Sequence, residues 1–505
     1  MKPINRGNGI TESERYLARL ADKAFLNLWS YPNTYVNKKL RGQGDGKELC
    51  DLLVVFGDDV LVFSDKEIAF RPHDDIVVAW KRWYRSAIEK SVGQIHGAER
   101  FLREHQDKIF LDKGCTESFP IDLPNPERMR FHGICVAIGA EQAAKEYWGG
   151  SDGSLIIADT SFASAYGTDL PFIIGDPKPE KPFVHVFDRT GLDAVLSEFN
   201  TISDLVEYLS HRARAIRARN IVAAHSEKDM IAFYFQNEDG HGNHSFDLPM
   251  RAPDQVLNIT EGLYASFQER PEYKARKLAD SISYTWDKLI TQFSDHVLAG
   301  TSVEIAHELP TAAMAEPALR FMAAEARVRR RALSQAFLDA LSKSQEQNKD
   351  RYARVVLPAE GTLPNVAYVF LILKYPSFLD NKGGYDQYRR VRATMLETYG
   401  YAVLQDNRSI ETVVGIAIDG HERDAESNGG SEDLMALQVS EWNAELETEI
   451  RQRRADLEIL KPGGQKYYGL SAQQFPSPPT VPMKETRQQR RARERREAKH
   501  KGRRG

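Results

Sequence analysis

Two residues of opposite charge, Asp51 and Lys66, are placed where they could act together on a phosphate. Asp51 interrupts the apolar run 49–56, and Lys66 follows the apolar run 60–63. An unpaired buried carboxylate is energetically expensive, so an aspartate in such a run indicates a bound partner or metal ion. Carboxylate oxygens suit Mg²⁺ or Mn²⁺, and a nearby lysine can orient a water and stabilise charge on a phosphate. The pair therefore predicts metal-assisted hydrolysis of a phosphate ester.

The segments that carry this pair are expected to form a β-hairpin. The runs 49–56 and 60–63 flank a Gly-Asp-Asp turn. Because successive side chains on a strand point to opposite faces, Ser64 and Lys66 share one face of the second strand. In an antiparallel hairpin Asp51 could lie across from both of them.

Two helices and a glycine-rich stretch frame the hairpin. Apolar residues recur at helical spacing over 11–29, and Glu14 stands in the first turn of that helix. A second helix is expected over 76–104 and carries Gln94. The polar stretch RGQGDGK leads directly into the strand of Asp51. The expected order is therefore helix, hairpin, helix.

This arrangement resembles the PD-(D/E)xK, or restriction-endonuclease-like, superfamily of nucleases. That family combines an acid on the N-terminal helix, a strand bearing Asp, a hairpin and a strand ending in acid-x-Lys. Its nuclease-related and restriction members often have a glycine-rich lead-in, and many carry a glutamine on the next helix. By this resemblance Glu14 matches the helix acid, Asp51 the first metal carboxylate and Lys66 the lysine, while Gln94 matches the helix glutamine. The resemblance covers about residues 10–113 and implies a catalytic set of Asp51, Lys66 and Gln94 with Mg²⁺ or Mn²⁺ as cofactor.

One position departs from the family pattern, because Ser64 stands where the acid two residues before the lysine is expected. A β-bulge could bring the adjacent Asp65 round to the metal. Alternatively, Glu48 or Glu14 could supply the second metal carboxylate beside Asp51. In the third outcome the fold remains but catalysis is lost.

The remaining chain is expected to form an α/β multidomain protein. Residues 10–180 are predicted to hold the restriction-endonuclease-like α/β core with a β-rich extension, and 184–347 a mainly helical region. A strand–helix–strand order predicts a small α/β unit with a terminal helix over 352–460. The stretch 461–505 is predicted to be a linker and a disordered basic tail.

Two groups of cations are candidates for contact with nucleic acid. Arg389, Arg390 and Arg392 lie near two tyrosines on a predicted helix, where a solvated helix face is the alternative to phosphate contact. Arg490 and Arg491 belong to the tail 484–505, whose net charge of +8 leaves −12 for the rest of the chain. Such a tail can attach to nucleic acid without sequence preference, or dock on an acidic protein.

The composition bounds the function more broadly. The three cysteines make no disulfide framework, no apolar stretch is long enough for a membrane helix, and the N-terminus lacks a signal peptide pattern, so a cytoplasmic protein is expected. The first hypothesis is a metal-dependent nuclease that hydrolyses phosphodiester bonds in DNA, in prokaryotic antiviral defence or DNA processing, with a possible protein partner. The second is a catalytically inactive nuclease fold that binds nucleic acid or serves assembly. A regulatory protein acting through its helical middle is a third possibility.

Overall fold

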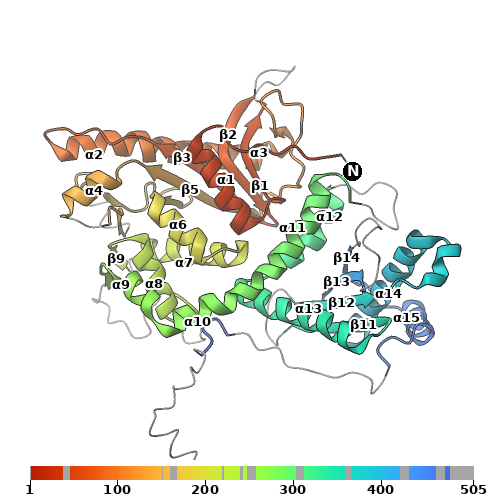
Figure 1. Cartoon of the computed structure of the whole chain (residues 1–505). Helices are drawn as coiled ribbons and strands as arrows, with labels where there is room; N and C mark the ends of the chain where they lie inside the picture. Colours follow the sequence, from red (N-terminus) through yellow and green to blue (C-terminus); the bar gives the residue numbers. More distant parts are fainter. Residues whose placement is uncertain are drawn as a thin grey trace, which may run out of the picture.

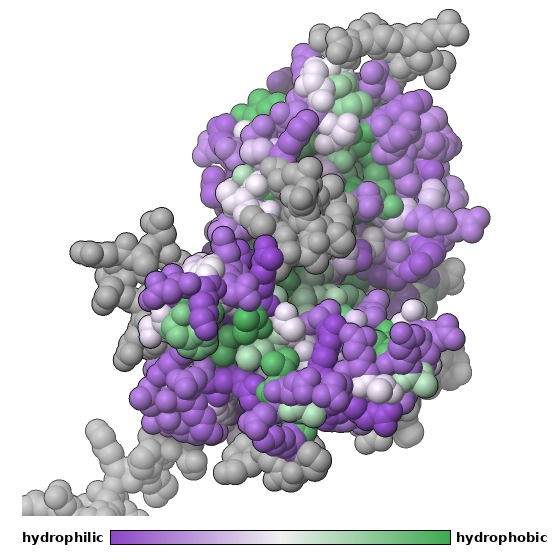
Figure 2. Space-filling view, turned by 90° about the vertical axis from the view of Figure 1, so that its right-hand side faces the viewer, coloured by the Kyte–Doolittle hydropathy of each residue, from purple (hydrophilic) through white to green (hydrophobic). Residues whose placement is uncertain are grey.

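The chain folds as a mixed α/β protein, shown in Figure 1. The computed structural model describes residues 2–37, 46–149, 152–159, 168–218, 221–238, 243–246, 257–302, 312–358, 365–420, 432–461 and 473–477. Within these residues the strands form three sheets. Apolar side chains dominate the interior, while hydrophilic residues cover most of the face seen in Figure 2. Among the described residues, no helix is both long and apolar enough to cross a lipid bilayer.

The first sheet contains the predicted hairpin and has the strand order β4-β1-β2-β3-β5-β8. Its strands are β1 (Ser30–Val36), β2 (Lys47–Phe56), β3 (Asp59–Glu67), β4 (Ile109–Phe110), β5 (Arg130–Ile138) and β8 (Val184–Phe187). The pairs β4–β1, β1–β2 and β2–β3 are antiparallel, whereas β5 and β8 continue the sheet in parallel. The hairpin prediction is thus confirmed. The sheet also extends past residue 180, because β8 pairs with β5.

Helices cover both faces of this sheet. They are α1 (Glu12–Phe25), α2 (Ile76–Tyr84) and α3 (Lys90–Glu104), with a π-helical turn (Arg85–Glu89) between the last two. Thr11 begins α1 as a capping box, in which its hydroxyl accepts from the Glu14 N–H and the Glu14 carboxylate accepts from the Thr11 N–H. On β3 the neighbouring residues Ser64 and Asp65 point to α3 and to α1, respectively. The two helices therefore lie on opposite faces.

A second, smaller sheet follows, with the order β10-β9-β6-β7. Its strands are β6 (Ile156–Ala158), β7 (Ile173–Ile174), β9 (Ile221–Ala224) and β10 (Leu257–Ile259). The helices of this part are α4 (Glu141–Tyr147), α6 (Arg189–Glu198), α7 (Ile202–Arg217), α8 (Glu227–Gln236), α9 (Leu263–Glu269) and α10 (Pro271–Asp280). The prediction of a mainly helical region over 184–347 missed β8, β9 and β10, because three or four residues carry too little periodicity to be recognised.

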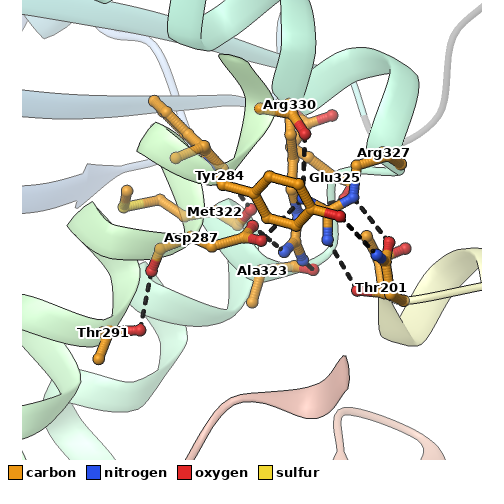
Figure 3. Close-up of polar contacts among 12 residues, drawn as sticks. Thr201, Tyr284, Asp287, Thr291, Met322, Ala323, Glu325, Arg327 and Arg330 are labelled. Carbon is orange, nitrogen blue, oxygen red and sulfur yellow. Dashed lines mark hydrogen bonds and ion pairs between the residues drawn. The ribbon is translucent and has the colours of Figure 1, made fainter. Parts of the chain in front are cut away.

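Three helices connect this part to the C-terminal sheet: α11 (Tyr284–Leu298), α12 (Ala312–Ala323) and α13 (Arg327–Gln347). Their junction is held by a cluster of buried charge that we call the arginine junction, formed by Arg327, Arg330 and Asp287 (Figure 3). Arg330 bonds Asp287 at 2.6 Å and donates to the carbonyls of Ala323 and Glu325. Arg327 bonds the other Asp287 oxygen at 2.7 Å.

The α12 helix contacts the sheets on either side of it. The indole N–H of the buried Trp29, just before β1, donates to Glu316 of α12 at 2.7 Å. At the other side the hydroxyl of Tyr368 donates to the carbonyl of Phe321 at 3.2 Å. The α12 helix therefore contacts both the first and the third sheet, and it lies between them in Figure 1.

The third sheet forms the predicted C-terminal unit and has the order β11-β12-β13-β14. Its elements are β11 (Arg351–Val356), β12 (Val366–Leu373), α14 (Gly384–Asp406), β13 (Thr412–Asp419), β14 (Glu432–Leu437) and α15 (Ala444–Asp456). The parallel pair β12–β13, connected through α14, confirms the strand–helix–strand prediction. The predicted terminal helix is α15, and the strand β14, which pairs with β13, precedes it. The basic tail lies outside the described residues.

Candidate functional site

Asp51 and Lys66 meet where β2 and β3 separate beyond the paired residues Leu52 and Phe63. The Lys66 Nζ lies 3.9 Å from Asp51 Oδ2. The same oxygen accepts a hydrogen bond of 2.5 Å from the backbone N–H of Asp65. Asp51 is 7% exposed, so its carboxylate is held in a fixed position away from bulk water.

The electrostatic surroundings of Asp51 disfavour its negative charge. Burial raises the pKa of Asp51 to about 6, although Lys66 and the Asp65 N–H act to lower it, and the nearby carboxylates of Glu48 and Glu14 raise it further. One lysine at 3.9 Å thus does not offset the cost of burying this carboxylate. A divalent cation placed here would relieve that cost.

Asn33 joins the two other carboxylates, and sequence analysis missed it. Its side-chain amide donates to Glu14 at 3.1 Å and to Glu48 at 2.8 Å. Asn33 is buried and has a φ of +50°, a left-handed conformation that asparagine tolerates better than most residues. It lies on β1, a strand that the sequence analysis did not predict. An asparagine after a proline was the only available signal.

Glu14 is held in its charged form. Burial raises the pKa of Glu14, but hydrogen bonds from Asn33 and from the backbone of Ile10 and Thr11 outweigh burial and lower it overall. The carboxylate therefore serves the helix cap and faces Asn33 at once. The two sets of hydrogen bonds hold the Glu14 carboxylate near the point where β2 and β3 separate.

Asp65 lies on the face opposite Lys66. The β3–β5 register is unbroken from Asp59 to Glu67, so no bulge turns Asp65 toward Asp51, and the bulge expectation is not met. Burial and the neighbouring Glu14 raise the pKa of Asp65, against a lowering influence of the Ser13 hydroxyl. Among the described residues, neither buried carboxyl oxygen of Asp65 makes a hydrogen bond of good geometry.

Ser64 and Gln94 meet on the Lys66 face. The Ser64 hydroxyl donates to Gln94 Oε1 at 3.3 Å, which links β3 to α3. Gln94 is exposed and does not contact Asp51 or Lys66 through any hydrogen bond between described residues. The structure therefore places Gln94 beside the pair, at its open side.

The donor set can be compared with the needs of a metal ion. Among the described residues, no group of three or more His, Cys, Asp or Glu side chains is arranged to hold one. Mg²⁺ usually needs only one or two protein carboxylates, because waters and substrate phosphates complete its octahedron. Asp51, with Glu48 or Glu14, would be the carboxylates available for such a site, because both glutamates act on the pKa of Asp51, which burial raises.

The C-terminal arginines are arranged differently from the expected phosphate-binding patch. Arg392 is fully buried and pairs with Asp433 at 2.7 Å and with Asp419. Arg389 also pairs with Asp433, at 2.9 Å. Only Arg390 of the three is exposed, because α14 turns the other two toward the third sheet. Arg490 and Arg491 lie outside the described residues.

Comparisons with known proteins identified no similar protein. No family model matches the chain, and neither the curated proteins nor the solved structures contain a match.

Proposed function

We propose that this protein is a metal-dependent nuclease of restriction-endonuclease-like fold that hydrolyses phosphodiester bonds in DNA. The observation that carries the proposal is the buried Asp51 with its raised pKa, 3.9 Å from Lys66 at the separating ends of β2 and β3. The order α1, three antiparallel strands, α2–α3 and a parallel β5 supports it, since the resemblance implies a helix, a hairpin and a following helix around the site.

In this proposal each residue has a separate task. Asp51, with Glu48 or Glu14, would hold Mg²⁺ or Mn²⁺, which supplies Lewis-acid stabilisation of the phosphate when bound. Lys66 orients the attacking water and stabilises charge on the phosphate. Asn33 keeps Glu14 and Glu48 in place, and Ser64 with Gln94 positions α3 beside β3.

The test is digestion of a supercoiled plasmid and of end-labelled oligonucleotides with Mg²⁺ or Mn²⁺. We expect Asp51→Asn and Lys66→Met each to slow cleavage by about 100-fold or more, the size of effect typical of a lost proton-transfer or charge-stabilising group. Asp22→Asn and Lys23→Met serve as matched controls, because both residues are exposed on α1. Undiminished cleavage by both site variants would exclude the assignment.

A second function is favoured by one specific observation. Ser64 stands where the family pattern has an acid, and its hydroxyl donates to Gln94. In that case the fold would bind nucleic acid or serve assembly without catalysis. Nucleic acid that binds with no cleavage under either metal would favour this function over the first.

A further inference from the structure

A groove of about 850 Å³ opens beside the candidate site. The side of α3 forms one wall, and the end of β1 with the start of β2 forms the other. Gln94 and Glu48 belong to both the groove lining and the candidate site. A ligand that lies in the groove would therefore end next to Asp51 and Lys66.

Four cations with no ion-pair partner among the described residues lie in the groove. Lys47, Lys90, Arg100 and Lys108 line it. Among the described residues, none of these four side chains forms an ion pair, whereas most buried arginines elsewhere are paired with a carboxylate. The carboxylates of Glu48 and Glu104 also line the groove, so its four cations exceed its acids and leave a positive balance. An excess of positive charge in a groove favours an anionic, extended ligand.

The α3 wall is unusually smooth. Gly93 and Gly97 stand one turn apart on the groove side, and a Cβ at either position would meet no atom within 4 Å. Glycine inside a helix destabilises it relative to alanine. No packing contact within the described structure requires glycine there, so close approach of a ligand explains the two glycines better.

An aromatic pair completes the groove. The rings of Phe101 and His105 meet edge to face, with centroids 5.1 Å apart, and both residues line the groove and are half-buried. Unpaired bases stack on such rings, while the bases of a duplex are already stacked on one another. Cations beside an aromatic platform are the combination that binds single strands.

We propose that this groove binds a single nucleic-acid strand, with its phosphates on Lys90 and Arg100 and a base on Phe101. The strand then runs past Gly97 and Gln94 toward Asp51. This inference rests on the proposed function, because it names the form of nucleic acid that the same site receives.

The test is fluorescence anisotropy in EDTA, with labelled 20-nucleotide oligothymidylate, oligouridylate and a blunt duplex. We expect the single strands to bind at least ten-fold more tightly than the duplex, and the two single strands to show whether the strand is DNA or RNA. The pair Lys90→Gln/Arg100→Gln should weaken binding at least ten-fold and reduce the slope of log K against log salt by about 1.4. Arg82→Gln/Lys145→Gln removes the same charge from other exposed positions and should change neither.

A groove-filling variant separates binding from folding. Leucine is a better helix former than glycine, so Gly97→Leu should stabilise α3 while it blocks the groove. We expect it to weaken oligothymidylate binding about ten-fold or more. Equal affinity for duplex and single strands, or unchanged affinity of Gly97→Leu, would overturn the inference. Cleavage that is lost in Asp51→Asn but unchanged in the groove variants would support the nuclease proposal and contradict the groove proposal. Single-strand binding in the groove without cleavage under any metal would support the groove proposal and contradict the nuclease proposal.

Discussion

The arginine junction and the carboxylates around Asp51 are two groups of buried charge with opposite construction. At the junction Arg330 is 1% exposed, and its guanidinium donates to Asp287 and to two backbone carbonyls. At the candidate site Asp51 has one lysine at 3.9 Å, and Asp65 has no hydrogen bond of good geometry to its carboxyl oxygens among the described residues.

The two groups differ in how completely their buried charges are hydrogen-bonded, and this difference distinguishes a structural cluster from a candidate ligand site. A buried ion is tolerated when its hydrogen bonds are satisfied, and the junction satisfies them. Burial instead raises the pKa of Asp51 and of Asp65, so their charged forms cost stability, and a cation beside Asp51 would offset that cost there. Perturbed and incompletely paired acids beside a groove are typical of functional sites.

The largest expected effect is the loss of stability when the junction is broken. Arg330→Met leaves the Ala323 and Glu325 carbonyls without their donor and removes one partner of Asp287. We expect the free energy of unfolding to fall by about 3–5 kcal/mol, measured by urea denaturation. Arg85→Met is the matched control, since its exposed pair with Glu89, at 4.0 Å, should contribute about 1 kcal/mol or less. Equal losses would mean that the junction network is not what holds these helices.

The second prediction concerns the pH dependence of stability at Asp51. Burial raises the pKa of Asp51 from 3.8 to about 6, so the folded state prefers the protonated acid and loses stability as pH rises between these values. In metal-free buffer, Asp51→Asn should equal wild type below about pH 4. Above about pH 6 it should be more stable by about 3 kcal/mol, from two pKa units at 1.36 kcal/mol each.

Asp59 provides a control of opposite sign. Burial raises the pKa of Asp59, but His132 and Arg130 outweigh burial and lower it overall. Asp59→Asn should therefore be less stable than wild type at neutral pH, and the difference should shrink in acid, where wild type loses the contribution of the charged Asp59. Thermal unfolding at several pH values measures this difference. If Asp51→Asn behaves in the same way, Asp51 is a structural partner of Lys66 and the contrast with the junction disappears.

The smallest effect is expected at Asn33. Asn33→Gly retains a residue that adopts the φ of +50° freely, and removes only the amide that bridges Glu14 and Glu48. We expect Mg²⁺ affinity, measured by calorimetry, to fall about 10- to 100-fold, as when a residue that orients metal ligands is lost. Asn348→Gly makes the same change at a φ of +46° next to α13 and should leave Mg²⁺ affinity unchanged.

The sequence predicted what depends on local pattern. The β2–β3 hairpin and the strand–helix–strand unit follow from the alternation of apolar residues and from turn chemistry. The prediction that Asp51 and Lys66 lie on the same face of the hairpin depended on the alternation of side chains along its two strands.

What escaped prediction depends on contacts between distant segments. The strand β1 contains Pro32, which is tolerated because β4 pairs only with Tyr35 and Val36 and leaves the proline at an unpaired edge. Asn33 acquires its role only once β1 lies beside β2. Likewise Arg392 looked like part of a basic surface until α14 packed it against Asp433 and Asp419.

The position of α12 has a consequence for how the ends of the molecule influence one another. This helix bonds Trp29 beside the first sheet through Glu316, and Tyr368 of the third sheet through Phe321. A molecule that displaced α12 from the third sheet would have to strain the Trp29 bond as well. The α12 helix is thus a physical path between the two sheets, and any energetic coupling that it carried would be reciprocal: a ligand that acted on one sheet through α12 would change binding at the other to the same extent as the reverse.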